Sequence, residues 1–371
     1  MRNGWKVVDS DTHQMEPDWL WVKYIDDHFK TVAPRLEATP SGHRVMMVEG
    51  EPLASEHGKY PVLAPEYQAA VAKAWHRFER ARRAGFSVEA RLADMDEEGV
   101  DVQVLFPTTG GKLLGREFRD TELLAACCRA YNNWSAEYCQ NARERLRFAA
   151  MLPFQDVDRA IAEAHRTAAM GAVSYFVRPN PIKGLNLNNK YYWPLWAEIE
   201  KLDRPVSIHD SGSPQLPSFG DRMDTHTSGH ILSHPFEAMY AMTCLIWGGI
   251  FERFPRLTVV HLEADAGWVP YWLQRMEQHW DFSGNAEHPD MKMRPTQYFR
   301  RNVFVACRSD EPTLKATIEL AGDNNFVWNS DYPHPDGTWP WALQKMEEQP
   351  IPEAAKRKIL WDNAARAFRL S

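Results

Sequence analysis

The sequence has few cysteines, no long apolar run and no excess of basic residues. Its five cysteines among 371 residues include no Cys-x-x-Cys pair, which argues against a disulfide framework and against a thiolate zinc site. No window approaches the roughly 18 apolar residues of a membrane-spanning helix, and no apolar stretch follows the basic residues of the opening MRNGWKVVDSDTH. We therefore expect neither a signal peptide nor a membrane span, and we expect a cytoplasmic location.

The chain also lacks the charge pattern of a nucleic-acid-binding protein. Lys and Arg number 43 against 50 Asp and Glu, which gives a net charge of −7, and no stretch gathers the basic residues together. A hydrophobic share of 44% and a charged share of 25% are those of a globular protein. The abundant residues are 15 Trp and 25 Pro, which indicate long, aromatic-lined loops of the kind that hold a pocket.

Short apolar or β-branched runs recur along the chain, and each is followed by a turn and a helical pattern. Eight runs are predicted to be strands, at 6–9, 101–106, 147–151, 172–177, 204–208, 257–262, 302–306 and 325–328. Helices are predicted between them at 120–142, 156–170, 193–202, 234–254 and 311–321. This alternation predicts an α/β fold, a (β/α)8 TIM barrel that forms a single domain over residues 1–371.

Two stretches interrupt the alternation. Residues 14–90 separate the first strand from its helix, and their EPDWLW opening, Pro-rich middle and basic helix around 70–83 predict a lid inserted over the barrel mouth. A second long loop is predicted at 210–233, after the fifth strand. We expect these two segments to determine substrate specificity.

Polar side chains follow several of the predicted strands. In a (β/α)8 barrel such residues gather at one mouth and form the active site. Strand one ends in Asp9-Ser10-Asp11-Thr12-His13, and strand alternation places Asp9, Asp11 and His13 on one side. The other candidates are His209 after strand five, His261 and Glu263 after strand six, and Asp331 after strand eight. Imidazole and carboxylate groups are ligands of divalent ions such as zinc, manganese or iron(II), so the sequence predicts a mononuclear metal site.

These residues resemble the amidohydrolase superfamily, in particular the branch related to aminocarboxymuconate-semialdehyde decarboxylase. The resemblance covers nearly the whole chain. It rests on DSDTHQMEP (9–17), RLADMDEEGVDVQVLFPT (91–108), FVRPNP (176–181), SIHDSGSP (207–214), WGGIFERFPRLTVVHLEADAGWVPYWLQRME (247–277) and NSDYPHPDGTWP (329–340), of which the last three are specific. It implies a barrel with one metal ion and substrates that are often carboxylated or aromatic. The implied chemistry includes decarboxylation, hydration and hydrolysis.

The resemblance also implies a set of metal ligands. They are Asp11, His13, His209, Glu263 and Asp331, with His261 as the alternative to Glu263 on strand six. The family's opening His-x-His is Asp11-x-His13 here, so an oxygen replaces one nitrogen. Asp331 is implied to serve both as a ligand and as a proton shuttle. The expected cofactor is one divalent ion, zinc in the first place, with manganese and iron(II) as alternatives.

The candidate catalytic residues are Asp331, His209, Arg178 and His334. Arg178 follows strand four and is interpreted as an anchor for a substrate carboxylate, because a guanidinium can hold a carboxylate bidentately. The alternative for Arg178 is a salt bridge to a structural carboxylate. His334 closely follows Asp331 and is expected to reach the pocket.

The leading interpretation is a metal-dependent hydrolase of a small organic acid or aromatic compound, with Asp331 as the base that activates a metal-bound water. The alternative is a non-oxidative decarboxylase, or a hydratase, of an aromatic or unsaturated carboxylic acid at the same site. A second alternative is a non-catalytic barrel that binds a ligand. The expected partners are a small-molecule substrate, carboxylated or aromatic, and further copies of the chain in a dimer or larger homo-oligomer. Nucleic acid and membrane are not expected.

Overall fold

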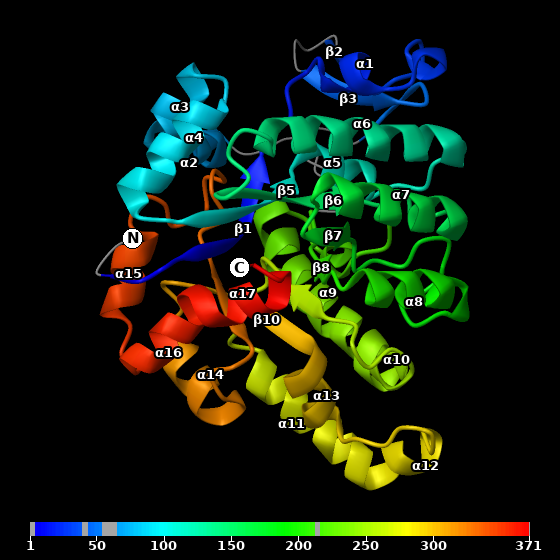
Figure 1. The fold of residues 1–371 in the computed structure, drawn as a ribbon, viewed down its shortest axis with the longest axis vertical. Coiled ribbons are helices and arrows are strands. Elements are labelled where there is room, and N and C mark those ends of the chain that lie inside the picture. The colour runs from blue at the N-terminus through cyan, green and yellow to red at the C-terminus, as the bar shows by residue number, and fades with distance from the viewer. Residues whose placement is uncertain (1–3, 39–43, 54–64, 212–215, 371) are drawn as a thin grey trace.

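The computed structural model describes residues 4–38, 44–53, 65–211 and 216–370, and its central feature is an eight-stranded parallel sheet. The strand order is β1-β5-β6-β7-β8-β9-β10-β11, so each strand lies beside the next barrel strand along the chain (Figure 1). The strands are β1 Val8–Gln14, β5 Val102–Pro107, β6 Leu146–Met151, β7 Ser174–Val177, β8 Val206–Ile208, β9 Val259–His261, β10 Val303–Arg308 and β11 Phe326–Asn329. All eight predicted strands are confirmed.

The first and last strands of the sheet meet and bring the barrel close to closure. The amide of His13 donates to the carbonyl of Tyr332 at 2.6 Å. The amide of Asp331 donates to the carbonyl of Asp11 at 3.1 Å. The sheet therefore curves into the (β/α)8 barrel that the sequence predicts.

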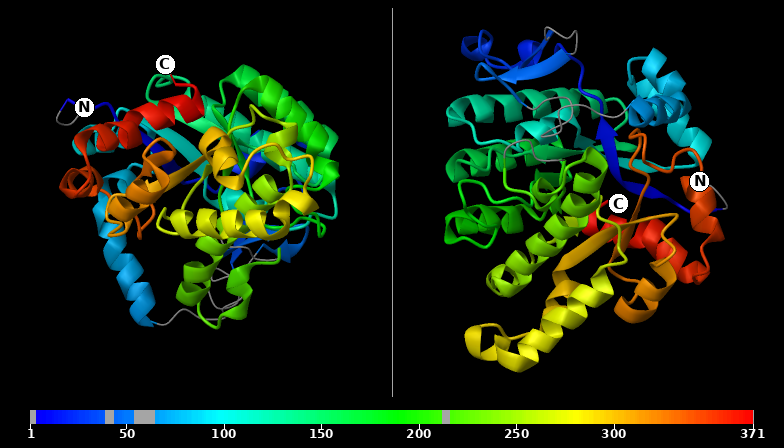
Figure 2. Two further views of the ribbon diagram at one scale, coloured as in Figure 1. Left: turned by 90° about the horizontal axis from the view of Figure 1, so that it is seen from below. Right: turned by 180° about the vertical axis from the view of Figure 1, so that it is seen from behind.

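Helices surround the barrel, as two further views show (Figure 2). The α-helices are α1 Leu20–Tyr24, α2 Pro65–Trp75, α3 Glu79–Arg83, α4 Val88–Glu98, α5 Thr109–Leu113, α6 Thr121–Cys139, α7 Val157–Met170, α8 Trp193–Leu202, α9 His226–Trp247, α10 Ile250–Arg253, α11 Val269–His279, α12 Asn285–Glu287, α13 Pro295–Asn302, α14 Leu314–Ala321, α15 Ala342–Glu348, α16 Glu353–Arg357 and α17 Asn363–Phe368. Short 3-10 or π segments are η1 Asp27–Phe29, η2 His76–Phe78, η3 Lys190–Tyr192, η4 Phe219–Arg222, η5 Trp280–Gly284 and η6 Lys358–Asp362. None of the helices in the described ranges combines the length and the apolar character that crossing a membrane requires.

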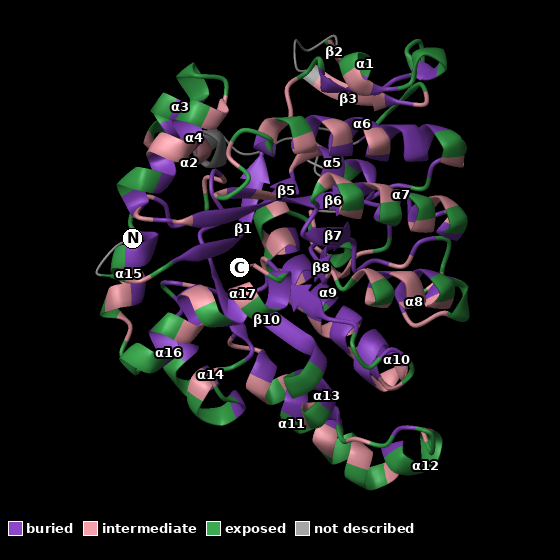
Figure 3. Ribbon diagram, in the orientation of Figure 1, coloured by how far each residue is buried: buried purple, intermediate pink, exposed green. Residues whose placement is uncertain are grey.

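The strands are buried on both faces, whereas the helices expose their outer faces (Figure 3). Neighbouring residues of β9 pack on opposite faces of the sheet, and both faces are covered. Val260 packs in the same buried cluster as Val104 and Val327, inside the barrel. Val259 packs in a second cluster that includes Leu273 of α11. Because both faces of each strand are covered, the strands read as near-continuous apolar runs, which is the pattern that identified them.

The described parts of the insertion at residues 14–90 lie in two places. Helix α1 and a small antiparallel sheet, β2 Arg35–Ala38, β3 Arg44–Val48 and β4 Glu51–Pro52, lie over α6 (Figure 1). The segment from α2 to α3 packs on the loop after β11, where Arg77 donates to the carbonyls of Gly337 at 3.1 Å and Trp339 at 2.9 Å. The small sheet was not expected, because its strands are only two to five residues long. A lid function for this insertion stays a prediction.

Helix α9 begins earlier than expected. The sequence pattern places its start at 234, but the helix begins at His226, where the Thr225 side chain caps it by accepting from the Ser228 amide at 3.3 Å. Pro235 lies inside the helix, and a proline ordinarily marks a helix start because it has no amide hydrogen to donate. The predicted loop at 210–233 is correspondingly shorter, and part of it, residues 212–215, lies outside the described residues.

Candidate active site

The ends of four strands bring five polar side chains to one point at the mouth of the barrel. Asp11 and His13 belong to β1, His209 follows β8, Glu263 follows β9 and Asp331 follows β11. The Nε2 atom of His13 lies 3.5 Å from Asp11 Oδ1 and 3.4 Å from Asp331 Oδ1. The Nε2 atom of His209 lies 3.5 Å from Asp11 Oδ1 and 3.1 Å from Glu263 Oε2. The structure thus brings all five predicted ligands together.

This spacing fits a shared divalent ion. Two ligand atoms that are each about 2.1 Å from an ion lie roughly 3.0 to 3.4 Å apart at octahedral to tetrahedral angles, close to the distances above. Hydrogen bonding does not explain the arrangement, because both carboxylate oxygens of Asp11 are buried without a hydrogen-bond partner among the described residues. The set of donor atoms therefore suits one metal ion.

The two histidines point their basic nitrogens at each other. The Nδ1 atom of His13 lies 3.1 Å from the carbonyl oxygen of Pro107, and that of His209 contacts the carbonyl oxygen of Asp210. A carbonyl oxygen only accepts, so each Nδ1 carries a hydrogen and each Nε2 is left to face the cluster. The two Nε2 atoms are 3.2 Å apart, a separation that a proton or a metal ion held between them would stabilise. Outer hydrogen bonds of this kind orient metal-binding histidines.

Glu263 and Asp331 share an unusual backbone conformation. Their φ angles are +46° and +58°, in the left-handed region that residues other than glycine seldom adopt. Such strain costs of order 1 kcal/mol per residue and is concentrated at functional sites. At both positions it turns a side chain into the cluster at a strand end.

Asp9 does not join the cluster, although strand alternation predicted that it would share a face with Asp11 and His13. The register between β1 and β5 shifts between Asp9 and Thr12, which breaks the alternation. Asp9 instead accepts hydrogen bonds from the amide of Ser330, at 2.9 Å, and from its hydroxyl. It therefore holds the residue that precedes Asp331.

Arg91 of α4 also supports the site, and sequence reasoning gave it no role. Its guanidinium donates to the carbonyl of His13 and, at 3.0 Å, to the side chain of Gln103. It also lies over the ring of Tyr332, 4.9 Å from the ring centroid. Arg91 thus contacts β1, β5 and the segment after β11 together. Its only signal in the sequence is its place in the matched stretch at 91–108.

Burial of several carboxylates governs the electrostatics of the cluster. Burial raises the pKa of Asp11, and burial raises the pKa of Asp331 to about 7. Burial lowers the pKa of His13 well below its usual value. For His209, the Asp11 and Glu263 carboxylates outweigh burial and raise the pKa to about 9. The carboxylates outnumber the compensating charges here, which is the condition that a divalent cation relieves.

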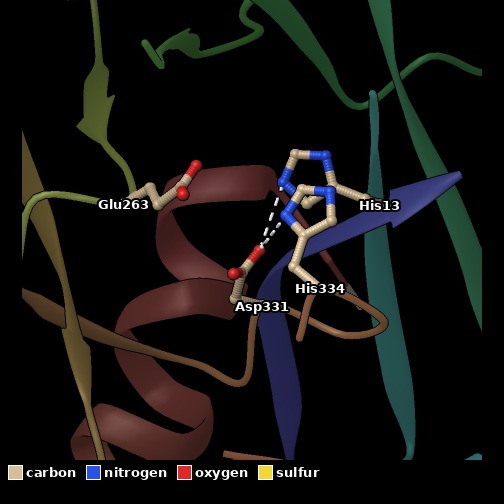
Figure 4. Close-up of side chains that lie close together, drawn as sticks. All are labelled: His13, Glu263, Asp331 and His334. Atoms are coloured by element: carbon tan, nitrogen blue, oxygen red, sulfur yellow. Dashed lines mark ion pairs between the residues drawn. The ribbon is translucent and has the colours of Figure 1, made fainter. Parts of the chain in front are cut away.

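His334 reaches the site, as expected, from the loop after β11. Its Nδ1 atom lies 2.9 Å from Asp331 Oδ1, and its ring stacks on that of His13 with centroids 4.0 Å apart. Figure 4 shows Asp331 paired with both histidines and Glu263 facing them from the other side. Burial lowers the pKa of His334, but the Asp331 carboxylate outweighs burial and raises it to about 10. His334 is thus placed to exchange a proton with Asp331.

Arg178 lies close to the cluster but has a carboxylate partner of its own. Its Nη2 atom lies 2.6 Å from Asp210 Oδ1, and both side chains are buried. The same nitrogen donates to Asn180 Oδ1 at 2.8 Å. Asp210 directly follows His209, so this geometry favours the salt-bridge alternative for Arg178. A role as substrate anchor stays a prediction that rests on its Nη1 atom, which has no hydrogen-bond partner among the described residues.

His261, the alternative ligand on strand six, lies apart from the five ligands. Its buried ring is perpendicular to the indole of Trp268 with centroids 6.3 Å apart. Among the described residues, neither of its ring nitrogens has a hydrogen-bond partner. Strand six thus presents Glu263, and not His261, to the cluster.

Comparisons with known proteins identify the family of the chain. The family described as Amidohydrolase matches residues 9–370. A 2-amino-3-carboxymuconate-6-semialdehyde decarboxylase of Dictyostelium discoideum is 26% identical over 74% of this chain and 75% of its own length. A gamma-resorcylate decarboxylase of Polaromonas is 24% identical over 76% of this chain and 87% of its own length.

Solved structures show the same fold. An amidohydrolase from Mycobacterium avium subsp. paratuberculosis superposes with a TM-score of 0.78 and 21% identity, over 98% of this chain and 99% of that one. The 5-carboxyvanillate decarboxylase of Sphingomonas paucimobilis superposes with a TM-score of 0.71 and 22% identity, over 99% of this chain and all of that one, 100%. The chain therefore belongs to the amidohydrolase family and is an enzyme of that superfamily, a hydrolase or a decarboxylase.

Proposed function

We propose that the protein is a metal-dependent, non-oxidative decarboxylase of a small aromatic carboxylic acid that bears a ring hydroxyl. The names of its relatives support this alternative over the hydrolase that the sequence favoured, since they include decarboxylases of a resorcylate and a carboxyvanillate. The observation that carries the proposal is the Asp331–His334 pair, whose Oδ1 and Nδ1 atoms are 2.9 Å apart beside the cluster of candidate metal ligands. An imidazole and a carboxyl group at this separation can pass a proton between them.

The cluster supplies the groups that such a reaction needs. An ion held by Asp11, His13, His209, Glu263 and Asp331 would supply a Lewis acid for the carboxylate and hydroxyl oxygens of the substrate. Asp331 gives its proton to the ring carbon that carries the carboxylate. The bond from that carbon to the carboxylate then breaks, its electron pair returns to the ring and CO₂ leaves. His334 restores the proton of Asp331.

The identity of the ion and the setting of the enzyme belong to the same proposal. Two nitrogen and three carboxylate donors suit zinc, manganese or iron(II). A dihydroxybenzoic acid decarboxylase from Polaromonas and a 5-carboxyvanillate decarboxylase from Novosphingobium aromaticivorans contain bound manganese, so we place manganese beside zinc as the candidate ion. A cytoplasmic location and a homo-oligomer stay predictions.

The proposal is tested with full-length protein loaded with Mn²⁺ or Zn²⁺. Hydroxybenzoic acids with the hydroxyl next to the carboxylate are expected to release CO₂ and the corresponding phenol. In D₂O the phenol should carry deuterium at the carbon that bore the carboxylate, because the new proton comes from an exchangeable group.

Esters and amides of the same acids serve as the matched test of hydrolysis. Cleavage of these compounds without CO₂ release from any hydroxybenzoic acid would support the hydrolase instead. A metal-loaded protein that binds the acids but transforms none of the compounds would support the non-catalytic barrel.

A further inference from the structure

A second group of metal-ligating side chains adjoins the first and shares Glu263 with it. His230 and His234 lie one turn apart on α9, and their Nε2 atoms are 3.7 and 3.5 Å from Glu263 Oε1. The other carboxylate oxygen, Oε2, is the one that lies 3.1 Å from His209 Nε2. Glu263 therefore presents one oxygen to each group of side chains.

The contacts between these side chains have the spacing of ligands around an ion. Distances of 3.5 and 3.7 Å exceed those of ordinary hydrogen bonds between imidazole and carboxylate. Two ligand atoms bound to one ion at a tetrahedral angle are separated by about 3.4 Å. The rings of His230 and His234 stack with centroids 3.9 Å apart, where two protonated rings would repel each other. Both Nε2 atoms face the same carboxylate oxygen of Glu263, so one cation can contact all three side chains.

The surroundings complete the donor set. The Nδ1 atom of His234 lies 2.9 Å from the hydroxyl of Ser233, which leaves its Nε2 atom for the cluster. The carboxylate of Asp336, on the loop after β11, lies 3.9 Å from His230 Nε2. The side chain of His230 is 39% exposed and that of His234 only 5%, so an ion can enter from solvent and meet a buried ligand.

We propose that His230, His234 and Glu263 bind a second divalent cation, with Asp336 as a further ligand, and that the Glu263 carboxylate bridges the two sites. Two imidazole nitrogens at positions i and i+4 of a helix, together with carboxylate oxygens, favour zinc or manganese. The proposed decarboxylation requires one ion, so this site goes beyond it. The sequence carries the His-x-x-x-His spacing of 230 and 234, but the helix predicted from the sequence begins at 234 and leaves 230 in a loop.

The metal content of the full-length protein tests this proposal. After saturation with Zn²⁺ and desalting, elemental analysis is expected to find about two ions per chain in the wild type and about one in His230→Ala and His234→Ala. His279→Ala is the matched control. His279 is an exposed histidine of helix α11 whose Nδ1 atom contacts the carbonyl of Arg275, and its variant should retain both ions.

A second measurement distinguishes a shared carboxylate from two separate sites. In the Mn²⁺-loaded wild type, electron paramagnetic resonance should show two exchange-coupled ions, and each α9 variant should show the signal of a single ion. One ion in the saturated wild type would overturn the proposal, as would two ions in both α9 variants. Because His230 is half-exposed, its variant should keep the wild-type melting temperature without added metal. The decarboxylase proposal is judged separately, by CO₂ release, and does not depend on this count.

Discussion

At the scale of single residues, the proposed function gives Asp331 two roles, metal binding and proton transfer, and a substitution can separate the two. The amide of Asp331→Asn still offers an oxygen to the ion but cannot transfer a carboxyl proton. We expect kcat to fall by about 100- to 10,000-fold, the usual contribution of a general acid. The variant should retain a larger fraction of its bound metal than of its turnover. Turnover and metal content of the same preparation provide the measurement.

The control for this variant is Asp27→Asn, because the Asp27 side chain is 92% exposed and lies in the insertion. It should keep both turnover and metal content. Wild-type turnover in Asp331→Asn would contradict the assignment of the proton to Asp331. Equal losses of turnover and of bound metal would mean that Asp331 acts only as a metal ligand and not in proton transfer.

The five candidate ligands could be predicted from the sequence, for a reason that does not apply to the residues around them. Asp11, His209 and Asp331 stand at the ends of apolar runs, and a barrel brings all such ends to one mouth. His230 and Arg91 lie on helices, where polar residues are common and their side-chain direction depends on packing. Pairwise packing of this kind is not visible in a single sequence, so these two residues were missed.

At the scale of elements, the eight barrel strands were predictable because both of their faces are buried and apolar. Elements with exposed or polar residues on one face were not predictable in this way. The small sheet β2 to β4 has short strands with exposed residues, which leave no apolar run. The first turns of α9 carry His226 and His230 ahead of Pro235, and polar residues followed by proline resemble a loop. Tertiary contacts with Glu263 and Asp336 supply the order that local sequence does not show.

Glu311 joins the ends of two elements and gives the fold a measurable pH dependence. Its carboxylate accepts from the amides of Ala266 at 2.7 Å, Gly267 at 3.2 Å and Arg308 at 3.1 Å. Burial, together with Asp265, raises the pKa of Glu311 to about 7, above its usual 4.5. The folded state therefore binds this proton more tightly than the unfolded state does. The resulting stability is fully present below pH 4.5 and is lost as the pH rises through 7.

Glu311→Gln removes this titration. Between pH 5 and 7, the free energy of unfolding of the wild type should fall relative to that of the variant by up to about 1.4 kcal/mol per pH unit. Denaturation at pH 5, 6, 7 and 8 measures the difference. Glu319→Gln is the control, since the Glu319 side chain is 64% exposed, and its curve should run parallel to that of the wild type. A parallel curve for Glu311→Gln would contradict the raised pKa.

At the scale of the whole molecule, the proposed metal site lies at the seam where the first and last strands of the barrel meet. Asp11 and His13 come from β1, whereas Asp331 follows β11, so an ion bound by all three holds the first and last strands together. The same seam carries the two backbone hydrogen bonds between His13 and Tyr332 and between Asp331 and Asp11. Ligand binding and barrel closure are therefore coupled, because only the closed seam assembles the ligands.

Removal of the ion should consequently loosen this seam more than the rest of the barrel. An ion present at about 1,000 times its dissociation constant stabilises the closed state by about 4 kcal/mol. Amide hydrogens that exchange only when the seam opens should then exchange roughly 1,000-fold more slowly. Hydrogen exchange with and without a chelator should show faster exchange at the amides of His13 and Asp331. The amides of Val173 and Tyr175, bonded to the carbonyls of Phe148 and Pro205 on the far strands, provide the internal reference. An equal change in exchange rate at all four amides would mean that the ion stabilises the barrel only globally. Unchanged exchange rates at His13 and Asp331 would mean that the ion binds elsewhere.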